Sequence, residues 1–578
     1  MNILFIIIGA AAILFSAYKI YGSYLSKKVF FLDDSKTTPA VLNNDGVDFV
    51  PTDNKFLTGQ HFSAISGAGP ISGPIIAGIM FGWVPALIWI ILGSIFIGGV
   101  HDMGSIISSV RHHAKSITEV IRHNVSKRAW ILFLIFIWIS LVYVIVAFTD
   151  ITSSSFTGTV ILENGESVGG GAIATSSLLY LILPMIMGIL LKKTKLSLTW
   201  ATIIFLPLVG FSIWIGPYIP FQLESIFNIS VLSAHKIWNA FILIYCLVAS
   251  VIPMWLLLQP RGHLGGYFMY ASLLTAAIGL IFGGFSIQYP AFTTFGDETQ
   301  SGWFPMFPLL FVTIACGACS GFHSLVGSGT TSKQLYKESD SKIVGYGMML
   351  MEAMVAIVAL ACVMILFEND NLVKSSPNFI FASGIGKFVE LIGISAAFGI
   401  SFGLMAFTTF VYDTLDVCAR LSRYIIQELT GWKHLIGKII AATVSVGVPL
   451  FFVSISLTDA NGNIVPSWKI FWNIFGSSNQ MLAAITLFGI SVWLHQTSKR
   501  KKAWIFTFIP ALFMYLMSNW ALLVLIQQNW FADAKLSLNS NPVPIVSVVI
   551  CILSLILTIE IFYVLFFKKK LNKDKTSK

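Results

Sequence analysis

Residues 61–74 read HFSAISGAGPISGP, and this stretch decides the fold. Three glycines and two prolines in an otherwise apolar segment oppose a continuous helix and free backbone carbonyls. In lipid, such a break is tolerated only where protein or a water-filled cavity satisfies the freed groups. The stretch therefore predicts a broken transmembrane helix in the centre of a helical bundle.

A second stretch of the same kind, CGACSGFHSLVGSGTT, covers residues 316–331. Each stretch has a His followed within two residues by a Ser, and then a Gly-x-Gly pair. This pattern indicates a degenerate internal repeat, and the order of the apolar segments predicts that its two copies cross the membrane in opposite directions. Paired broken helices in opposed halves are typical of secondary transporters, whose substrate site lies between them. The alternative is that the small residues only let helices pack closely.

The rest of the chain has the composition of a membrane protein. Of its 578 residues, 56% are hydrophobic and 11% are charged, so lipid has to solvate much of its surface. Runs of about 20 apolar residues cross a bilayer, and we count about fifteen of them. They lie at roughly 2–24, 61–81, 84–110, 129–149, 172–191, 197–217, 235–258, 264–285, 304–332, 343–367, 388–412, 434–458, 470–494, 504–527 and 543–567. The predicted fold class is an all-α polytopic membrane protein of about fifteen transmembrane helices, with an inverted repeat and two discontinuous helices.

The distribution of basic residues among the loops predicts how the chain is oriented across the membrane. With the N-terminus outside, the inside loops carry 30 Lys and Arg residues and the outside loops carry 5, as the positive-inside rule requires. We therefore expect the C-terminus, with its KKKLNKDKTSK tail, in the cytoplasm. The N-terminal segment has no basic region before it and no convincing cleavage site, so it is expected to be a retained helix. Residues 413–433 have helical apolar spacing and are expected to form an interfacial helix.

Several long phrases resemble the carbon starvation protein A (CstA) family of membrane transporters. They are HFSAISGAGPISGP (61–74), GGVHDMG (98–104), PMWLLLQPRGHL (253–264), FPLLFVTIACGACSGFHSLVGSGTTSKQ (307–334), VGYGMMLMEAM (344–354), TTFVYDTLDVCARLSRY (408–424) and IFWNIFGSSNQMLAAITL (470–487). The resemblance implies ion-driven uptake of small nutrients, with peptides and pyruvate as associated substrates, across the bacterial inner membrane. Gly262, His263 and His101 depart from the family pattern, so the substrate stays open.

The resemblance also divides the chain. It covers about residues 55–490. We expect an N-terminal helix and inside loop at 1–55, a CstA-like transporter core at 56–490, and C-terminal transmembrane helices with a basic tail at 491–578.

Ionisable residues inside apolar segments are costly, which makes them functional candidates. Glu352 lies mid-segment without a cation nearby in the sequence, which suits a proton carrier; the alternative is a neutral Glu hydrogen-bonded to a neighbouring helix. Asp102 is expected either to coordinate a cation or to hold a helix end. Asp413 is a third ion-coupling candidate, whereas Asp416 is expected to form a structural salt bridge with Arg420, four residues on.

Residues of the two broken segments are predicted to bind the substrate. Freed backbone groups, hydroxyls and half-helix N-termini favour an anionic ligand such as a carboxylate. We expect residues 63–70 and 321–330 to be unwound and to share one site, although the two histidines could equally be packing residues. The predicted substrate-binding residues are His61, Ser63, Ser66, Gly67, Gly69, Ser320, His323, Ser324, Ser328, Thr330 and Asn479.

Other classes of function find no support in the sequence. It has no Walker phosphate loop and no nucleophile spaced with a base, which excludes ATP drive and predicts that the protein is not an enzyme. Cys316 and Cys319 are expected to pack as small residues, with no metal site and no cofactor. The predicted function is an ion-coupled secondary transporter that imports a short peptide or a pyruvate-like carboxylate, with H⁺ or Na⁺ as the coupling ion. A passive channel or an amino-acid carrier is the alternative. The expected partners are the small-molecule substrate and the lipid bilayer, with no nucleic acid and an open oligomeric state.

Overall fold

A computed structural model describes residues 2–46, 49–161, 167–299, 302–432, 434–458, 464–530 and 542–567. Within these residues, 12 helices are long and apolar enough to cross a membrane, or up to 13 if the bent pair α3 (Asn54–Ile65) and α4 (Gly69–Phe81) counts as one span. The all-α membrane fold is therefore confirmed, whereas the number of about fifteen spans is not.

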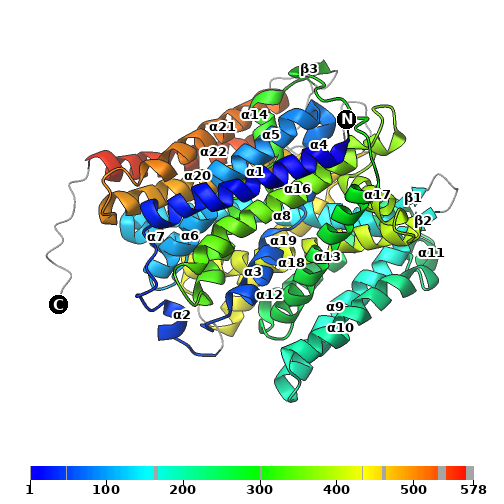
Figure 1. The fold of residues 1–578 in the computed structure, drawn as a ribbon, viewed down its shortest axis with the longest axis horizontal. Helices are drawn as coiled ribbons and strands as arrows, with labels where there is room; N and C mark the ends of the chain where they lie inside the picture. Colours follow the sequence, from blue (N-terminus) through cyan, green and yellow to red (C-terminus); the bar gives the residue numbers. More distant parts are fainter. Residues whose placement is uncertain are drawn as a thin grey trace.

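The long helices pack side by side in one bundle (Figure 1). They are α1 (Ile3–Tyr24), α5 (Trp83–Gly93), α6 (Gly99–Arg111), α8 (Lys127–Thr157), α9 (Gly170–Lys193), α10 (Leu198–Ile215), α12 (Val231–Val251), α13 (Leu258–Phe282), α16 (Met348–Met364), α18 (Ala396–Thr430), α19 (Leu435–Ser454), α20 (Ser467–Thr497), α21 (Ile505–Trp530) and α22 (Val543–Phe562). The π-helical turns η1 (Leu25–Val29), η2 (Ser94–Gly98), η5 (Lys342–Gly347) and η7 (Tyr563–Phe567) extend or join them.

Shorter elements complete the bundle. The short helices are α2 (Pro39–Leu42), α7 (Ile117–Asn124), α11 (Leu223–Phe227), α14 (Met306–Thr313), α15 (Phe322–Gly329) and α17 (Pro377–Glu390). Three antiparallel hairpins pair β1 (Thr159–Ile161) with β2 (Ser167–Gly169), β3 (Gly296–Thr299) with β4 (Gly302–Pro305), and β5 (Leu457–Thr458) with β6 (Ile464–Val465).

The bundle has two distinct ends. We call the end where α1 begins and where β1 to β4 lie the hairpin end, and the opposite one the basic end (Figure 1). At the basic end, where α1 stops, Arg500 donates a hydrogen bond to the Tyr24 hydroxyl. Trp504 packs on Phe566 there as well, so α22 also stops at this end. The start of α1 and the end of η7 therefore lie at opposite ends of the bundle.

Burial separates central from peripheral helices. The most apolar 18-residue window is 89% buried in the span that contains α16, 78% in α18 and 72% in α8, but only 17% in α1 and 28% in the span that contains α10. The outer helices expose large apolar side chains such as Phe5, Phe15 and Trp200, which is the surface that lipid solvates. The centre of the bundle is therefore built by α8, α16 and α18, together with α6 and α20, most of whose residues are also buried.

Helix α18 corrects two predictions. It runs unbroken for 35 residues, so the predicted span at 388–412 starts too early, in the separate helix α17. The predicted interfacial helix at 413–433 is also wrong, because most of that stretch is the second half of α18 and buries Asp413 and Asp416. Both carboxylates pair with Arg261 inside the protein, so this stretch does not need water at the membrane surface to solvate them.

Both predicted discontinuous helices are present, but their breaks are shifted. The first break is only Ser66–Ala68, where α3 and α4 meet at a bend of 49°. The second break covers Ile314–Gly321, and residues 322–329, expected to be unwound, form helix α15. Gly317 takes a positive φ of 87° in this break, a conformation that favours glycine. Gly327 instead lets α15 approach α6, because an added Cβ would lie 3.1 Å from Ile106.

The two broken segments run in opposite directions and touch. Thr52, just before α3, pairs with Leu335, just after α15, so the start of one segment lies beside the end of the other. A Cβ added at Gly69 would lie 2.5 Å from both Cβ and Sγ of Cys316. The two breaks are therefore in direct contact in the centre of the bundle.

This contact predicts that Gly69→Ala is destabilising. The added methyl group overlaps Cys316, and overpacking of this kind costs about 1–3 kcal/mol. Gly59→Ala, on α3, is the matched control, because its Cβ would meet the nearest atom, on Tyr270, at an ordinary 3.7 Å. Thermal unfolding of the two purified variants in detergent should show a lower Tm for Gly69→Ala only. Equal Tm values would show that the two breaks are not packed as described.

Candidate functional site

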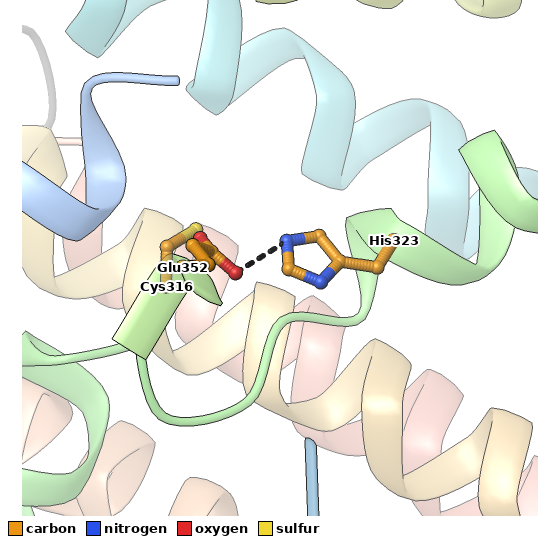
Figure 2. Close-up of side chains that lie close together, drawn as sticks. All are labelled: Cys316, His323 and Glu352. Carbon is orange, nitrogen blue, oxygen red and sulfur yellow. Dashed lines mark ion pairs between the residues drawn. The ribbon is translucent and has the colours of Figure 1, made fainter. Parts of the chain in front are cut away.

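A chain of buried ionisable side chains crosses the centre of the bundle next to the breaks. Asp102 on α6 lies between two histidines, with Oδ1 2.7 Å from Nδ1 of His101 and Oδ2 2.8 Å from Nδ1 of His323 on α15. Nε2 of His323 lies 3.4 Å from a carboxylate oxygen of Glu352 on α16 (Figure 2). All four residues are at most 1% exposed. Glu352 has no basic residue near it in the sequence, but the fold brings the imidazole of His323 next to its carboxylate.

The contact between His323 and Glu352 can be occupied by one proton. An ionised Asp102 only accepts hydrogen bonds, so the facing Nδ1 of His323 carries a hydrogen. Its Nε2 then faces Glu352 either as a lone pair opposite a protonated carboxyl or as an N–H opposite a carboxylate. The Glu352 carboxylate also adjoins the backbone amide of Gly317, and the His323 ring adjoins the Cys316 thiol. The gap therefore suits a proton that moves between the two side chains.

Polar residues of the second break and α20 surround this pair. Asn479 on α20 accepts a hydrogen bond from the backbone amide of Phe322, the first residue of α15, at 2.9 Å. It donates one to Ser320 at 3.0 Å, and its amide lies 3.8 Å from Sγ of Cys316. Asn479 therefore holds the end of the break against α20. Cys316, expected only to pack, belongs to the cluster.

Three of these side chains are also spaced like metal ligands. Ligand atoms of Cys316, His323 and Glu352 lie within 4.8 Å of one another (Figure 2), a grouping that sequence spacing could not predict. A tetrahedral site needs a fourth ligand, and Sγ of Cys316 is already turned toward Ser320 at 3.4 Å. These three side chains could therefore share a proton or, with a water molecule as the fourth ligand, hold a metal ion.

A second buried network ties the first broken segment to α18. Nε of Arg261 on α13 lies 2.6 Å from Asp413, and its Nη1 lies 2.5 Å from Asp416. Ser63 on α3 donates a hydrogen bond to the other Asp413 oxygen at 2.9 Å, and Tyr245 donates one to Asp416. Asp416 therefore pairs with Arg261, and the predicted salt bridge with Arg420 is wrong. Arg261 itself, within the QPR phrase, was not among the predicted residues.

The remaining predicted site residues fall into two groups. Nδ1 of His61 lies 2.8 Å from the hydroxyl of Thr331, just after α15, and its Nε2 has no partner within the described residues, nor has the Ser66 hydroxyl in the first break. Ser324 and Ser328 instead donate to carbonyls of their own chain segment. Ser324 also lies 3.3 Å from the Thr486 hydroxyl on α20, and Ser328 accepts a hydrogen bond from the backbone amide of Ile117 on α7, so these two serines join α15 to neighbouring helices.

Cavities connect this region with the basic end. Two cavities of about 1400 and 950 Å³ lie at that end, and a smaller one of about 40 Å³ is lined by His61, Ser63, Thr330 and Asp413. All three share Gln60 among their lining residues. The three cavities therefore adjoin one another at Gln60 between the basic end and the first broken segment, and the innermost one has room for only a few water molecules.

Two broken helices that touch beside a buried ionisable chain, inside a bundle of membrane-spanning helices, define a membrane transporter. A family model described as Carbon starvation protein CstA matches residues 2–379 and 366–521. The chain belongs to this family.

The curated proteins that this chain resembles are also transporters, as their names state. The peptide transporter CstA of Bacillus subtilis is 31% identical over 564 residues, covering 90% of each chain, and that of Helicobacter pylori is 31% identical over 566 residues, covering 87% of this chain and 79% of the relative. The pyruvate/proton symporter BtsT of Escherichia coli is 28% identical over 612 residues, covering 90% of this chain and 81% of the relative. The protein is thus a transporter of small nutrients and not an enzyme.

Proposed function

We propose that the protein couples the import of a small carboxylate, such as pyruvate or a short peptide, to the movement of protons. The observation that carries this proposal is the buried chain from His101 through Asp102 and His323 to Glu352, which ends at the contact between the two breaks. A carboxyl and an imidazole that share one proton away from water form a site that loads and releases a proton.

The same geometry suggests how the proton is coupled to the substrate. Glu352 lies beside the second break, since the backbone of Gly317 adjoins its carboxylate and the Gly317 Cα faces Pro70 of the first segment. Loading Glu352 with a proton removes a charge from the place where the two segments meet. We propose that this change lets the breaks rearrange around a substrate whose carboxylate is held by freed amides and by the Ser66 hydroxyl.

The relatives support both substrate classes named in the proposal. Two of those cited are named as peptide transporters and one as a pyruvate/proton symporter. The outer cavity of about 1400 Å³ has room for either molecule, whereas the cavity of about 40 Å³ at His61 and Asp413 would have to widen to admit one.

Uptake by purified protein in liposomes tests the proposal. We expect radiolabelled pyruvate or dialanine to accumulate when the vesicle lumen is alkaline, and to equilibrate without accumulating when only a sodium gradient is imposed. Empty liposomes control for passive entry of the protonated acid. Accumulation that needs sodium and ignores the pH gradient would contradict proton coupling, and no uptake of either substrate would contradict the substrate class.

We further propose that the protein lies in the bacterial inner membrane with its basic end in the cytoplasm, because the basic loops gather there. An alkaline phosphatase fused after residue 578 is then expected to be inactive, and one fused after residue 530, following α21, to be active. The reverse pattern of activity would invert this orientation.

A further inference from the structure

Two buried arginines in the cavities of the basic end form no ion pair within the described residues, and the nearby carboxylate of Asp416 is paired with Arg261. Arg420 and Arg423 lie one turn apart on α18 and both line the larger cavity, and Arg420 also lines the second one. They are 7% and 3% exposed, respectively. Their spacing on the helix puts both guanidinium groups on one face.

Only neutral groups bind these arginines in the part of the chain that the structure describes. Arg420 donates hydrogen bonds to the carbonyls of Ala249 and Ile252, at the end of α12, and Arg423 donates one to the Gln427 side chain. Nε of each arginine is buried without a hydrogen-bond partner there. Buried charges are costly unless they are paired, so a mobile anion is the expected partner.

The surroundings of the two arginines carry an excess of positive charge. The cationic side chains that line the two cavities are Lys115, Arg122, Lys192, Lys333, Arg420, Arg423 and Lys438. The acidic ones described there are Glu119 and Glu428. Glu119 is already paired with Arg122, and Glu428 accepts a hydrogen bond from Trp130, so neither is available to Arg420 or Arg423.

We propose that Arg420 and Arg423 form an oxyanion site, distinct from the central one, on the path between the basic end and the breaks. Their planar guanidinium groups match the oxygens of a carboxylate or a phosphate. The occupant is the carboxylate of the transported molecule, which rests on the proposed function, or the phosphate of an anionic lipid headgroup. A transported carboxylate would pause here after leaving the breaks.

Protection from phenylglyoxal, which modifies guanidinium groups, tests this site in the full-length protein. We expect pyruvate and inorganic phosphate to slow the modification of Arg420 and Arg423 in phosphatidylcholine nanodiscs, read by mass spectrometry of the peptides, with chloride of equal ionic strength as the control. The rate at Arg128, which is exposed and lines neither cavity, should not change. Protection that appears only with phosphatidylglycerol in the disc identifies a lipid phosphate as the occupant. Unchanged rates at both arginines with pyruvate, phosphate and phosphatidylglycerol would overturn the site.

Variants provide a second measurement. Loss of two charge-assisted hydrogen bonds in R420Q/R423Q should weaken pyruvate binding about tenfold or more, and R420K/R423K should lie between this variant and the unmodified protein. R128Q, whose exposed arginine pairs with Glu560 and lines neither cavity, is the matched control and should bind within about twofold of the unmodified protein. Equal affinity for pyruvate in all variants would exclude the transported carboxylate as the occupant, and together with unchanged phenylglyoxal rates in phosphatidylglycerol it would overturn the site.

The protection experiment also separates this inference from the proposed function. Phosphate protection does not depend on what is transported, so it would uphold the site even if pyruvate were neither bound nor transported. Pyruvate transport without protection by any of the probes would overturn the site and leave the proposed function intact.

Discussion

Glu352→Gln is expected to abolish uptake against a concentration gradient and to leave substrate exchange intact. Gln keeps the size of the side chain and cannot carry a proton, so the site opposite His323 stays in one charge state. Radiolabelled substrate should no longer accumulate above the level of empty liposomes under an imposed pH gradient. Counterflow, which needs binding and helix movement without net proton transfer, should continue.

The matched control for this variant is Glu390→Gln. Glu390 ends α17 and is exposed, so the same chemical change there should leave accumulation unaltered. Accumulation in Glu352→Gln at the level of the unmodified protein would show that this carboxyl carries no coupling proton.

Arg261→Gln is expected to cause the largest loss of stability. Arg261 is the cation placed between Asp413 and Asp416, and all three side chains are buried. Removing one partner of a buried ion pair costs about 3–5 kcal/mol, because the remaining charge is left uncompensated. We expect a strongly reduced yield of folded protein and a lower Tm in detergent.

Two comparisons make this prediction specific. Arg128→Gln, which removes an exposed arginine paired with Glu560, should cost at most about 1 kcal/mol. Combining R261Q with D413N and D416N removes the stranded charges and should restore part of the lost Tm. A stable Arg261→Gln protein, or no recovery in the triple variant, would mean that the network does not hold α13 to α18.

The sequence predicted the class of fold because its signals are local. Apolar runs and the Gly-Pro content of residues 61–74 are visible within single segments, and the structure confirms broken helices at both predicted places. The extent of the second break could not be predicted, because Gly327 serves close packing against α6, whereas Gly317 provides the turn. Nothing in the sequence separates these two uses of glycine.

The ion-pair partners of the buried acidic residues were predicted least well, because these partners lie on helices that are distant in the sequence. Asp416 was matched to Arg420 by its i, i+4 spacing, but the helix turns Asp416 toward Arg261, more than 150 residues away in the chain. Glu352 is buried in α16, but its partner His323 could not be predicted, because His323 lies on α15 and reaches Glu352 only through the turn of the second break. The QPR phrase was the one available signal for Arg261, because an arginine before an apolar segment can be buried as well as interfacial.

The most direct test of proton coupling is the pH inside the vesicle during substrate entry. Proteoliposomes that contain the dye pyranine and start without a pH gradient should acidify when pyruvate or dialanine is added to the unmodified protein, beyond the change seen in empty liposomes. Those with Glu352→Gln should exchange substrate without acidification. Substrate uptake by the unmodified protein without any acidification, or equal acidification by the Glu352→Gln variant, would contradict the account.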